Sequence, residues 1–144
     1  MQHITWYLKN VKSKWLLAAA IYNILWGTWV ILFPQAIFDL TQIPAMKYPQ
    51  IWQCVGMIVG VYGLGYGIAA VDPDRHWPIT LVGFLGKIFG PIGFLFAVLQ
   101  GDFPILFVFT LITNDFIWWI PFYKILKRAQ ARAEARDTRV VGTL

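Results

Sequence analysis

Four long apolar stretches constrain the fold of this chain more than any other feature. They cover residues 15–33, 51–71, 77–99 and 103–122. The hydrocarbon core of a bilayer is about 30 Å thick, and a helix of roughly 20 apolar residues spans it. The sequence therefore predicts an all-α, antiparallel bundle of four transmembrane helices, which forms one membrane domain over residues 1–144.

The composition agrees with a membrane protein. Hydrophobic residues make up 58% of the chain and charged residues 13%, whereas soluble domains carry about 25% charged residues. Cys54 is the only cysteine, so an intramolecular disulfide and a cysteine metal cluster are both excluded. His3 and His76 are isolated from each other and do not form a metal site. No residue pattern indicates a particular cofactor.

Basic residues are concentrated on one side of the predicted membrane. The side that holds both termini and the 72–76 loop carries ten of the 12 Lys and Arg residues, Lys47 lies on the other side and Lys87 within a span. The positive-inside rule then places both termini in the cytoplasm, in a multi-pass protein of a cell inner membrane or another bacterial-type membrane. No basic domain stands apart from the spans, which argues against nucleic-acid binding.

Three flanking segments complete the predicted architecture. The first 14 residues are expected to form an amphipathic helix that lies in the membrane interface, the alternative being a frayed start to the first span. The tail, residues 123–144, is basic, extends the fourth helix into the cytoplasm and can bind anionic lipid headgroups. The apolar, proline-rich loop 34–50 either lies among the outer headgroups or covers a cavity between helices.

The second and third spans each carry a stripe of four glycines. Small residues let helix backbones approach closely in membranes, so the stripes are expected to face each other or neighbouring helices. They consist of Gly56, Gly60, Gly63 and Gly67, and of Gly83, Gly86, Gly90 and Gly93.

Two opposite charges lie inside the third and fourth spans. Lys87 and Asp115 are each 14 positions from a tight turn at Gly101, which places both at roughly 20 Å from that turn. A charge in hydrocarbon costs several kcal/mol unless it is paired or hydrated. The matched depth therefore predicts a buried ion pair.

Further polar features fall at the same level. Pro91 follows Lys87 by four residues and cannot donate the helical hydrogen bond to its carbonyl. Asn23 and Tyr62 lie near the midpoints of the first and second spans. All four spans are thus expected to contribute to one polar centre, which can line a wet cavity or a binding site.

The fourth span adds the string NDFIWWIPF at residues 114–122. Asn114 adjoins Asp115, and Trp118 and Trp119 follow Asp115 by three and four residues, which places them on its side of the helix. Such an acid can accept a hydrogen bond from an indole, or form the floor of an aromatic ligand pocket.

This string resembles small uncharacterised four-helix integral membrane proteins of bacteria, including cyanobacteria. Over the last span alone, it is also similar to the sterol-isomerase and sigma-2 receptor superfamily. That likeness implies an acid-lined lipid pocket between helices. The chain lacks the second intramembrane carboxylate of that superfamily, so no catalytic residue is carried over.

Three functions remain open at this point. The leading hypothesis is a membrane protein that binds a lipid-like or isoprenoid-like hydrophobic molecule, or that assists a membrane complex as a partner subunit or homo-oligomer. The second is a proton-coupled carrier or channel subunit, and the third an enzyme acting on an apolar substrate. A purely structural role for the polar residues is also open. The candidate ligand-binding residues are Asp115, Lys87, Asn114, Trp118, Trp119, Asn23 and Tyr62.

Overall fold

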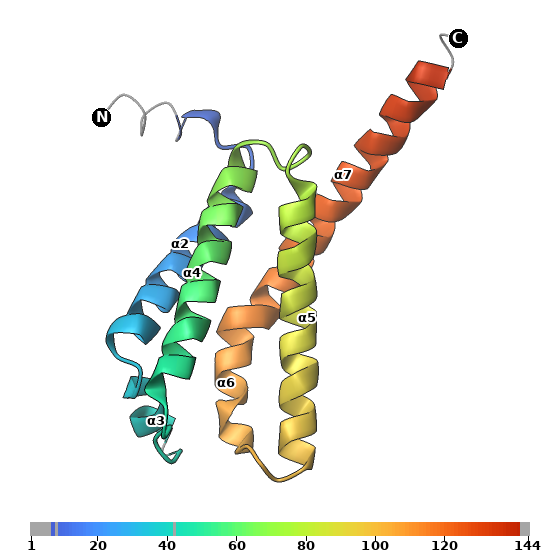
Figure 1. The fold of residues 1–144 in the computed structure, drawn as a ribbon. Coiled ribbons are helices and arrows are strands. Elements are labelled where there is room, and N and C mark those ends of the chain that lie inside the picture. The colour runs from blue at the N-terminus through green and yellow to red at the C-terminus, as the bar shows by residue number, and fades with distance from the viewer. Residues whose placement is uncertain (1–6, 8, 42, 142–144) are drawn as a thin grey trace.

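Every regular element in the computed structural model, which describes residues 7, 9–41 and 43–141, is helical. Four helices are long and apolar enough to cross a membrane: Lys14–Leu32, Pro49–Val71, Trp77–Leu99 and Ile105–Arg132. They coincide with the four predicted spans within a few residues at most boundaries, and they pack as an all-α bundle (Figure 1). The predicted fold class is confirmed.

The first three spans are single helices, whereas the fourth is built from several pieces. The elements in chain order are α2 (Lys14–Leu32), α3 (Ala36–Thr41), α4 (Pro49–Val71), α5 (Trp77–Leu99), the 3₁₀ turn η1 (Ile105–Phe107), α6 (Val108–Leu111), the π-helical turn η2 (Ile112–Phe116) and α7 (Ile117–Val141).

Local chemistry explains where several helices begin. The Ser13 hydroxyl accepts a 3.3 Å hydrogen bond from the Leu16 N–H and caps α2. Proline in the first turn of α4 and of α5 costs no hydrogen bond, because a backbone N–H at that position would have no helical acceptor and proline lacks this N–H. Gly101 has a φ of 78°, which glycine adopts without strain, and it forms the turn between α5 and the fourth span.

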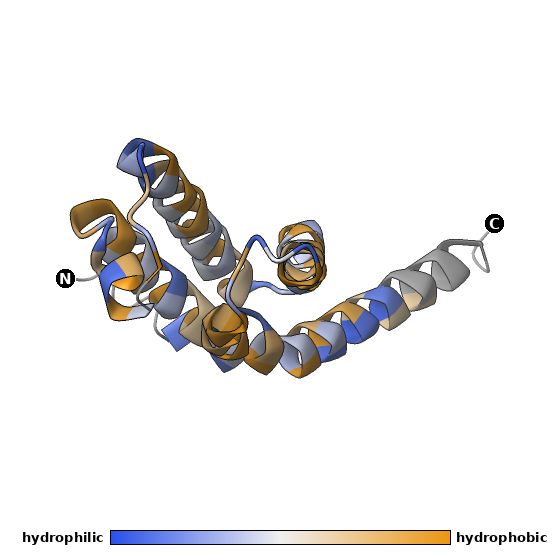
Figure 2. Cartoon of the chain, turned by 90° about the horizontal axis from the view of Figure 1, so that it is seen from below, coloured by the Kyte–Doolittle hydropathy of each residue, from blue (hydrophilic) through white to orange (hydrophobic). Residues whose placement is uncertain are grey.

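The start of α2 and the end of α7 lie on the side of the bundle that holds the α4–α5 loop (Figure 1). Half of the predicted interfacial helix, residues 1–6 and 8, lies outside the described residues. Tyr7 is helical and its hydroxyl donates a 2.6 Å hydrogen bond to the Gly67 carbonyl, but residues 11–13 are not helical and separate this segment from α2, so a continuous helix over the first 14 residues is wrong. The basic tail continues α7 as predicted, to Val141, and residues 142–144 lie outside the described part. Figures 1 and 2 show that α7 projects from the bundle and becomes hydrophilic there.

Helices α2 and α4 form the closest pair in the bundle. A Cβ at Gly27 of α2 would lie 2.5 Å from the Gly56 carbonyl oxygen of α4, and one at Gly63 would lie 2.9 Å from the Ala20 oxygen. The glycine stripe of α4 therefore packs against α2 and not against the stripe of α5. Gly27, which sequence reasoning missed, is the partner of this stripe.

The buried core lies at the end of the bundle near the α4–α5 loop. Tyr66 of α4 packs directly on Gly83 of α5, where a Cβ would lie 2.1 Å from the tyrosine oxygen, whereas a Cβ at Gly86 would meet no atom within 4 Å. The two helices therefore diverge beyond this contact. The core consists of Leu16, Ala19, Ala20, Tyr66, Ala69, Ala70, Trp118, Phe122 and Ile125.

Candidate functional site

Five of the seven predicted site residues line one small cavity in the middle of the bundle. Asn23 comes from α2, Tyr62 from α4, Lys87 from α5, and Asn114 and Asp115 from η2, around a volume of about 170 Å³. All four spans thus contribute a polar group at one level. These five residues are called the polar centre below.

Lys87 and Asp115 are both almost fully buried, with 5% and 4% of their surface exposed. Neither of the two ion pairs found among the described residues joins them. The Lys87 Nζ instead donates a 2.5 Å hydrogen bond to the backbone oxygen of Asn114, and the Asn114 Nδ2 donates a 3.2 Å hydrogen bond to the Asp115 Oδ1. The predicted direct ion pair is therefore wrong, and Asn114 bridges the two charges.

The π-helical turn explains this arrangement. The Ile117 N–H donates to the Ile112 carbonyl, five residues earlier, so the backbone departs from the i to i−4 pattern at the polar centre. Such single-turn π segments often occur at functional sites. The irregular turn presents the Asn114 carbonyl to Lys87. This carbonyl gives the Lys87 ammonium a hydrogen-bond acceptor inside the span.

The two tryptophans support the polar centre from outside its cavity. The Trp118 Nε1 donates a 3.0 Å hydrogen bond to the Thr113 carbonyl, and the Trp119 Nε1 donates a 2.9 Å bond to the Lys87 carbonyl. Neither indole bonds to Asp115, and neither side chain lines the cavity. Backbone carbonyls take both indole donors, so neither indole forms the hydrogen bond to Asp115 that the sequence allowed.

An apolar groove meets the polar centre. Its volume is about 400 Å³, and it shares Asn114 and Asp115 with the smaller cavity. The exposed glycines Gly86, Gly90 and Gly93 form one wall, so we call it the glycine groove. The remaining lining residues are Trp26, Ile37, Trp52, Val55, Val59, Phe94, Ala97, Phe103, Phe107, Thr110 and Leu111.

Helix α3 contributes to the groove from the loop between the first two spans. Ile37 lines the groove, and the Phe38 ring packs edge-on against Trp52, with centroids 5.6 Å apart. Of the two expectations for this loop, these contacts match the one in which it covers a cavity between helices.

Three buried polar atoms of this region have no hydrogen-bond partner among the described residues. They are the Asn23 Oδ1, the Asn114 Oδ1 and the Trp52 Nε1. Leaving a buried polar group unpaired costs about 1–3 kcal/mol. Two of the three atoms are acceptors in the polar centre, so a hydrogen-bond donor placed there would gain partners.

Sequence reasoning missed two residues of the site. Tyr66 lines the polar cavity and lies four residues after Tyr62, a spacing that places both on one helical face. Thr113 accepts the Trp118 indole bond at its carbonyl, while its hydroxyl accepts a 3.2 Å bond from the Tyr22 hydroxyl. The helical spacing could have identified Tyr66, but no sequence signal indicated the role of Thr113.

Among the described residues, no group of three or more His, Cys, Asp or Glu side chains could hold a metal ion. The site consists of a polar centre, an adjoining apolar groove and a supporting set of hydrogen bonds to backbone carbonyls. The four long apolar helices around it are typical of a small polytopic membrane protein. No family model, curated protein or solved structure matches the chain.

Proposed function

We propose that this membrane protein binds one lipid-like or isoprenoid-like molecule, with its apolar chain in the glycine groove and its polar head at the polar centre. The observation that carries the proposal is that the glycine groove and the cavity of the polar centre share a wall. Asn114 and Asp115 line both the groove and the cavity. A molecule lying in the groove would therefore place its end at Lys87 and Asp115, the charges that lie within the apolar stretches of the third and fourth spans.

The groove has the size and chemistry of a site for an apolar chain. Ligand pockets typically measure about 300–1,000 Å³ and are lined mainly by apolar and aromatic side chains, and this one measures about 400 Å³. Gly86 and Gly93 leave its wall without side chains, and a Cβ at either would meet no atom within 4 Å. This open side would let a bilayer component enter laterally.

The polar centre favours a head that donates hydrogen bonds. The Asn23 Oδ1 and the Asn114 Oδ1 are buried acceptors without partners among the described residues, and Asp115 adds a carboxylate that accepts one described hydrogen bond. A hydroxyl or an amine matches these groups, because it supplies the missing donor. An apolar molecule ending in a hydroxyl, such as a prenyl-type alcohol, combines both requirements.

The charge distribution supports an orientation for this site. Because both termini and the 72–76 loop carry ten of the 12 basic residues, we place that end of the bundle in the cytoplasm. The packed core lies at that end. The glycine groove then opens toward the opposite leaflet, from which the ligand would enter.

The bundle core argues against a conduction path through the protein. Along α7, the buried Trp118, Phe122 and Ile125 lie between Asp115 and the cytoplasmic end. The Phe122 ring packs edge-on against Tyr66, with centroids 5.1 Å apart. A proton or ion path from the polar centre would have to cross this apolar layer.

Lipid extraction followed by mass spectrometry of the purified protein tests the proposal. We expect one apolar molecule with a donor head to co-purify in stoichiometric amount. Gly93→Leu should remove it without lowering the thermal stability, because a Cβ at this position meets no atom within 4 Å and the added side chain would occupy the groove. Leu95→Phe is the matched control, since it adds bulk to the same helix at an exposed residue that does not line the groove.

Two outcomes would overturn the proposal. The first is the absence of a stoichiometric molecule combined with self-association of the protein, which would favour a groove covered by a membrane partner. The second is retention of the molecule in Gly93→Leu and in Asp115→Asn, which would place its site elsewhere.

A further inference from the structure

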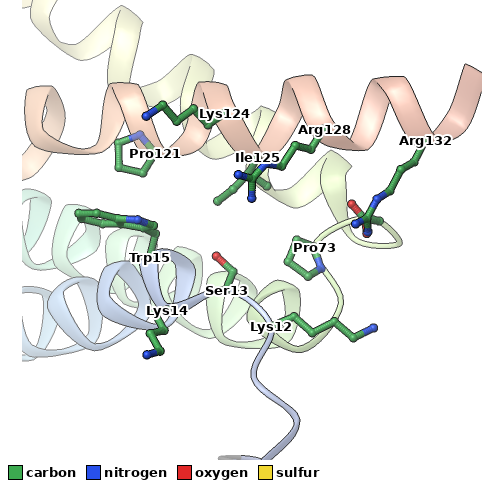
Figure 3. Close-up of a pocket in the computed structure, with 11 residues that line it drawn as sticks. Lys12, Ser13, Lys14, Trp15, Pro73, Pro121, Lys124, Ile125, Arg128 and Arg132 are labelled. Atoms are coloured by element: carbon green, nitrogen blue, oxygen red, sulfur yellow. The ribbon is translucent and has the colours of Figure 1, made fainter.

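A second pocket lies at the other end of the bundle, apart from the groove. Its volume is about 400 Å³, and it is bounded by the start of α2, the α4–α5 loop and α7 (Figure 3). We call it the basic pocket. It is lined by Lys12, Ser13, Lys14, Trp15, Pro73, Asp74, Pro121, Lys124, Ile125, Arg128 and Arg132.

The charge of this pocket is strongly unbalanced. Five cationic side chains and one carboxylate line it. Arg132 pairs with Asp74, and Lys12 lies 3.7 Å from a carboxylate oxygen of Asp72. Lys14, Lys124 and Arg128 have no ion-pair partner in the described part of the chain.

Three basic residues of α7 that line the pocket form a row along one helical face. Lys124, Arg128 and Arg132 recur every four residues, and like charges at this spacing destabilise a helix. Only Arg132 of this row has a described carboxylate partner. An anion bound next to Arg128 would relieve the repulsion.

The side chains in Figure 3 indicate where such an anion would lie. Arg128 extends from α7 past Ile125 on the side that faces Ser13, whereas Lys12 extends sideways and the Lys14 ammonium points away from α7. The Ser13 hydroxyl oxygen accepts the Leu16 N–H, which leaves its proton available for donation. A guanidinium and a hydroxyl facing one space can together bind phosphate oxygens.

The position of the pocket indicates that the anion carries an apolar part. Spans α2 and α5 begin at Lys14 and Trp77, and α4 ends at Val71, so the pocket lies at the membrane surface. Trp15 is 59% exposed and lies beside Pro121 on the membrane side of Arg128. Tryptophan at this depth typically lies among lipid headgroups and the adjoining chains.

From these observations, we propose that the basic pocket binds the phosphate group of an anionic phospholipid, with Arg128 and Ser13 on the phosphate and Trp15 beside the lipid chains. Basic pockets between transmembrane helices bind such headgroups in other membrane proteins. The site is separate from the glycine groove and does not depend on the function proposed for it.

Native mass spectrometry of the full chain in detergent, titrated with phosphatidylglycerol or phosphatidylcholine, tests this proposal. We expect one preferred phosphatidylglycerol. Arg128→Gln should weaken its binding by about tenfold or more, since a hydrogen bond to a charged group contributes roughly that factor. Lys127→Gln is the matched control, because this exposed neighbour has the same charge but does not line the pocket. It should change binding by less than about fivefold, the contribution of one surface charge.

Glycerol phosphate, added as a soluble competitor, distinguishes a lipid phosphate from a free one. Weak competition of glycerol phosphate with phosphatidylglycerol supports the lipid site as proposed. If glycerol phosphate binds as tightly as the lipid, the Arg128 site belongs to a free phosphate ester and the lipid assignment is overturned. Equal losses in Arg128→Gln and Lys127→Gln would also overturn the proposal, because they would reduce the effect to general surface attraction. Thermal unfolding of both variants in lipid-free detergent should show no loss of stability, which excludes a folding defect.

Discussion

The indole of Trp119 donates a 2.9 Å hydrogen bond to the backbone carbonyl of Lys87. Pro91, four residues after Lys87, cannot supply the helical N–H that would normally bond to this carbonyl. The proline of α5 and the tryptophan of α7 are therefore complementary: one leaves an acceptor free and the other occupies it. This bond also holds the fourth span against the residue whose ammonium lies in the polar centre.

The Trp119 bond predicts a specific rescue. Trp119→Phe should destabilise the protein by about 1–3 kcal/mol, because it leaves the Lys87 carbonyl without a partner. In a Pro91→Ala background the loss should be much smaller, since the new N–H at position 91 can bond to that carbonyl. Thermal unfolding in detergent measures both effects. Equal losses in the two backgrounds would show that the bond does not stabilise the fold.

Lys87 and Asp115 should be energetically coupled although they are not in direct contact. Lys87→Met and Asp115→Asn should each destabilise the protein by about 1–3 kcal/mol, as each leaves a buried polar group with fewer partners. The double variant should lose less than the two single losses combined, because both charges are removed together. Strict additivity in the double-mutant cycle would contradict this coupling.

The side chain of Asn114 provides a comparison for the double-mutant cycle of Lys87 and Asp115. Lys87 bonds to the backbone oxygen of Asn114 and not to its side chain, so Asn114→Ala leaves that bond in place. It removes only the amide that donates to Asp115. Asn114→Ala should therefore cost about 1 kcal/mol, and its cost should be the same with and without Lys87→Met. A strong dependence on Lys87 would indicate that the amide contacts the ammonium in solution.

The α2–α4 interface predicts different outcomes at two glycines. Gly27→Ala should destabilise by about 1–3 kcal/mol, the usual cost of overpacking, because its Cβ would lie 2.5 Å from the Gly56 oxygen. Gly60→Ala should be neutral or slightly stabilising, since a Cβ there meets no atom within 4 Å and alanine favours the helix. Thermal unfolding of the two variants provides the test, and a neutral Gly27→Ala would contradict the close packing.

The orientation of the protein can be tested by cysteine labelling. In a Cys54→Ser background, Ala135→Cys should be protected from an impermeant thiol reagent in intact cells, because the orientation proposed from the positive-inside rule puts the part of α7 beyond the fourth span in the cytoplasm. Lys47→Cys, at the other end of the bundle, should be labelled under the same conditions. The reverse pattern would invert the proposed topology and the leaflet toward which the glycine groove opens.

The sequence by itself determined the number of spans, most of their boundaries, the Gly101 turn and the shared level of Lys87 and Asp115. Each of these depends on local properties: a long apolar run, a glycine that adopts positive φ, or a count of residues at constant rise. Even the carbonyl left free by Pro91 could be predicted, since proline lacks the donor wherever it occurs.

Only the tertiary structure decided which groups meet at that level. The contacts depend on the rotation of each helix about its axis, and a π turn changes that rotation within a span because it adds a residue to one turn. For this reason Lys87 bonds to the Asn114 carbonyl and not to Asp115, and both indoles bond to backbone oxygens. Likewise, the hydropathy of α5 does not show that Gly83 packs on Tyr66 while Gly86 lines a groove, because that difference comes from the divergence of two helices.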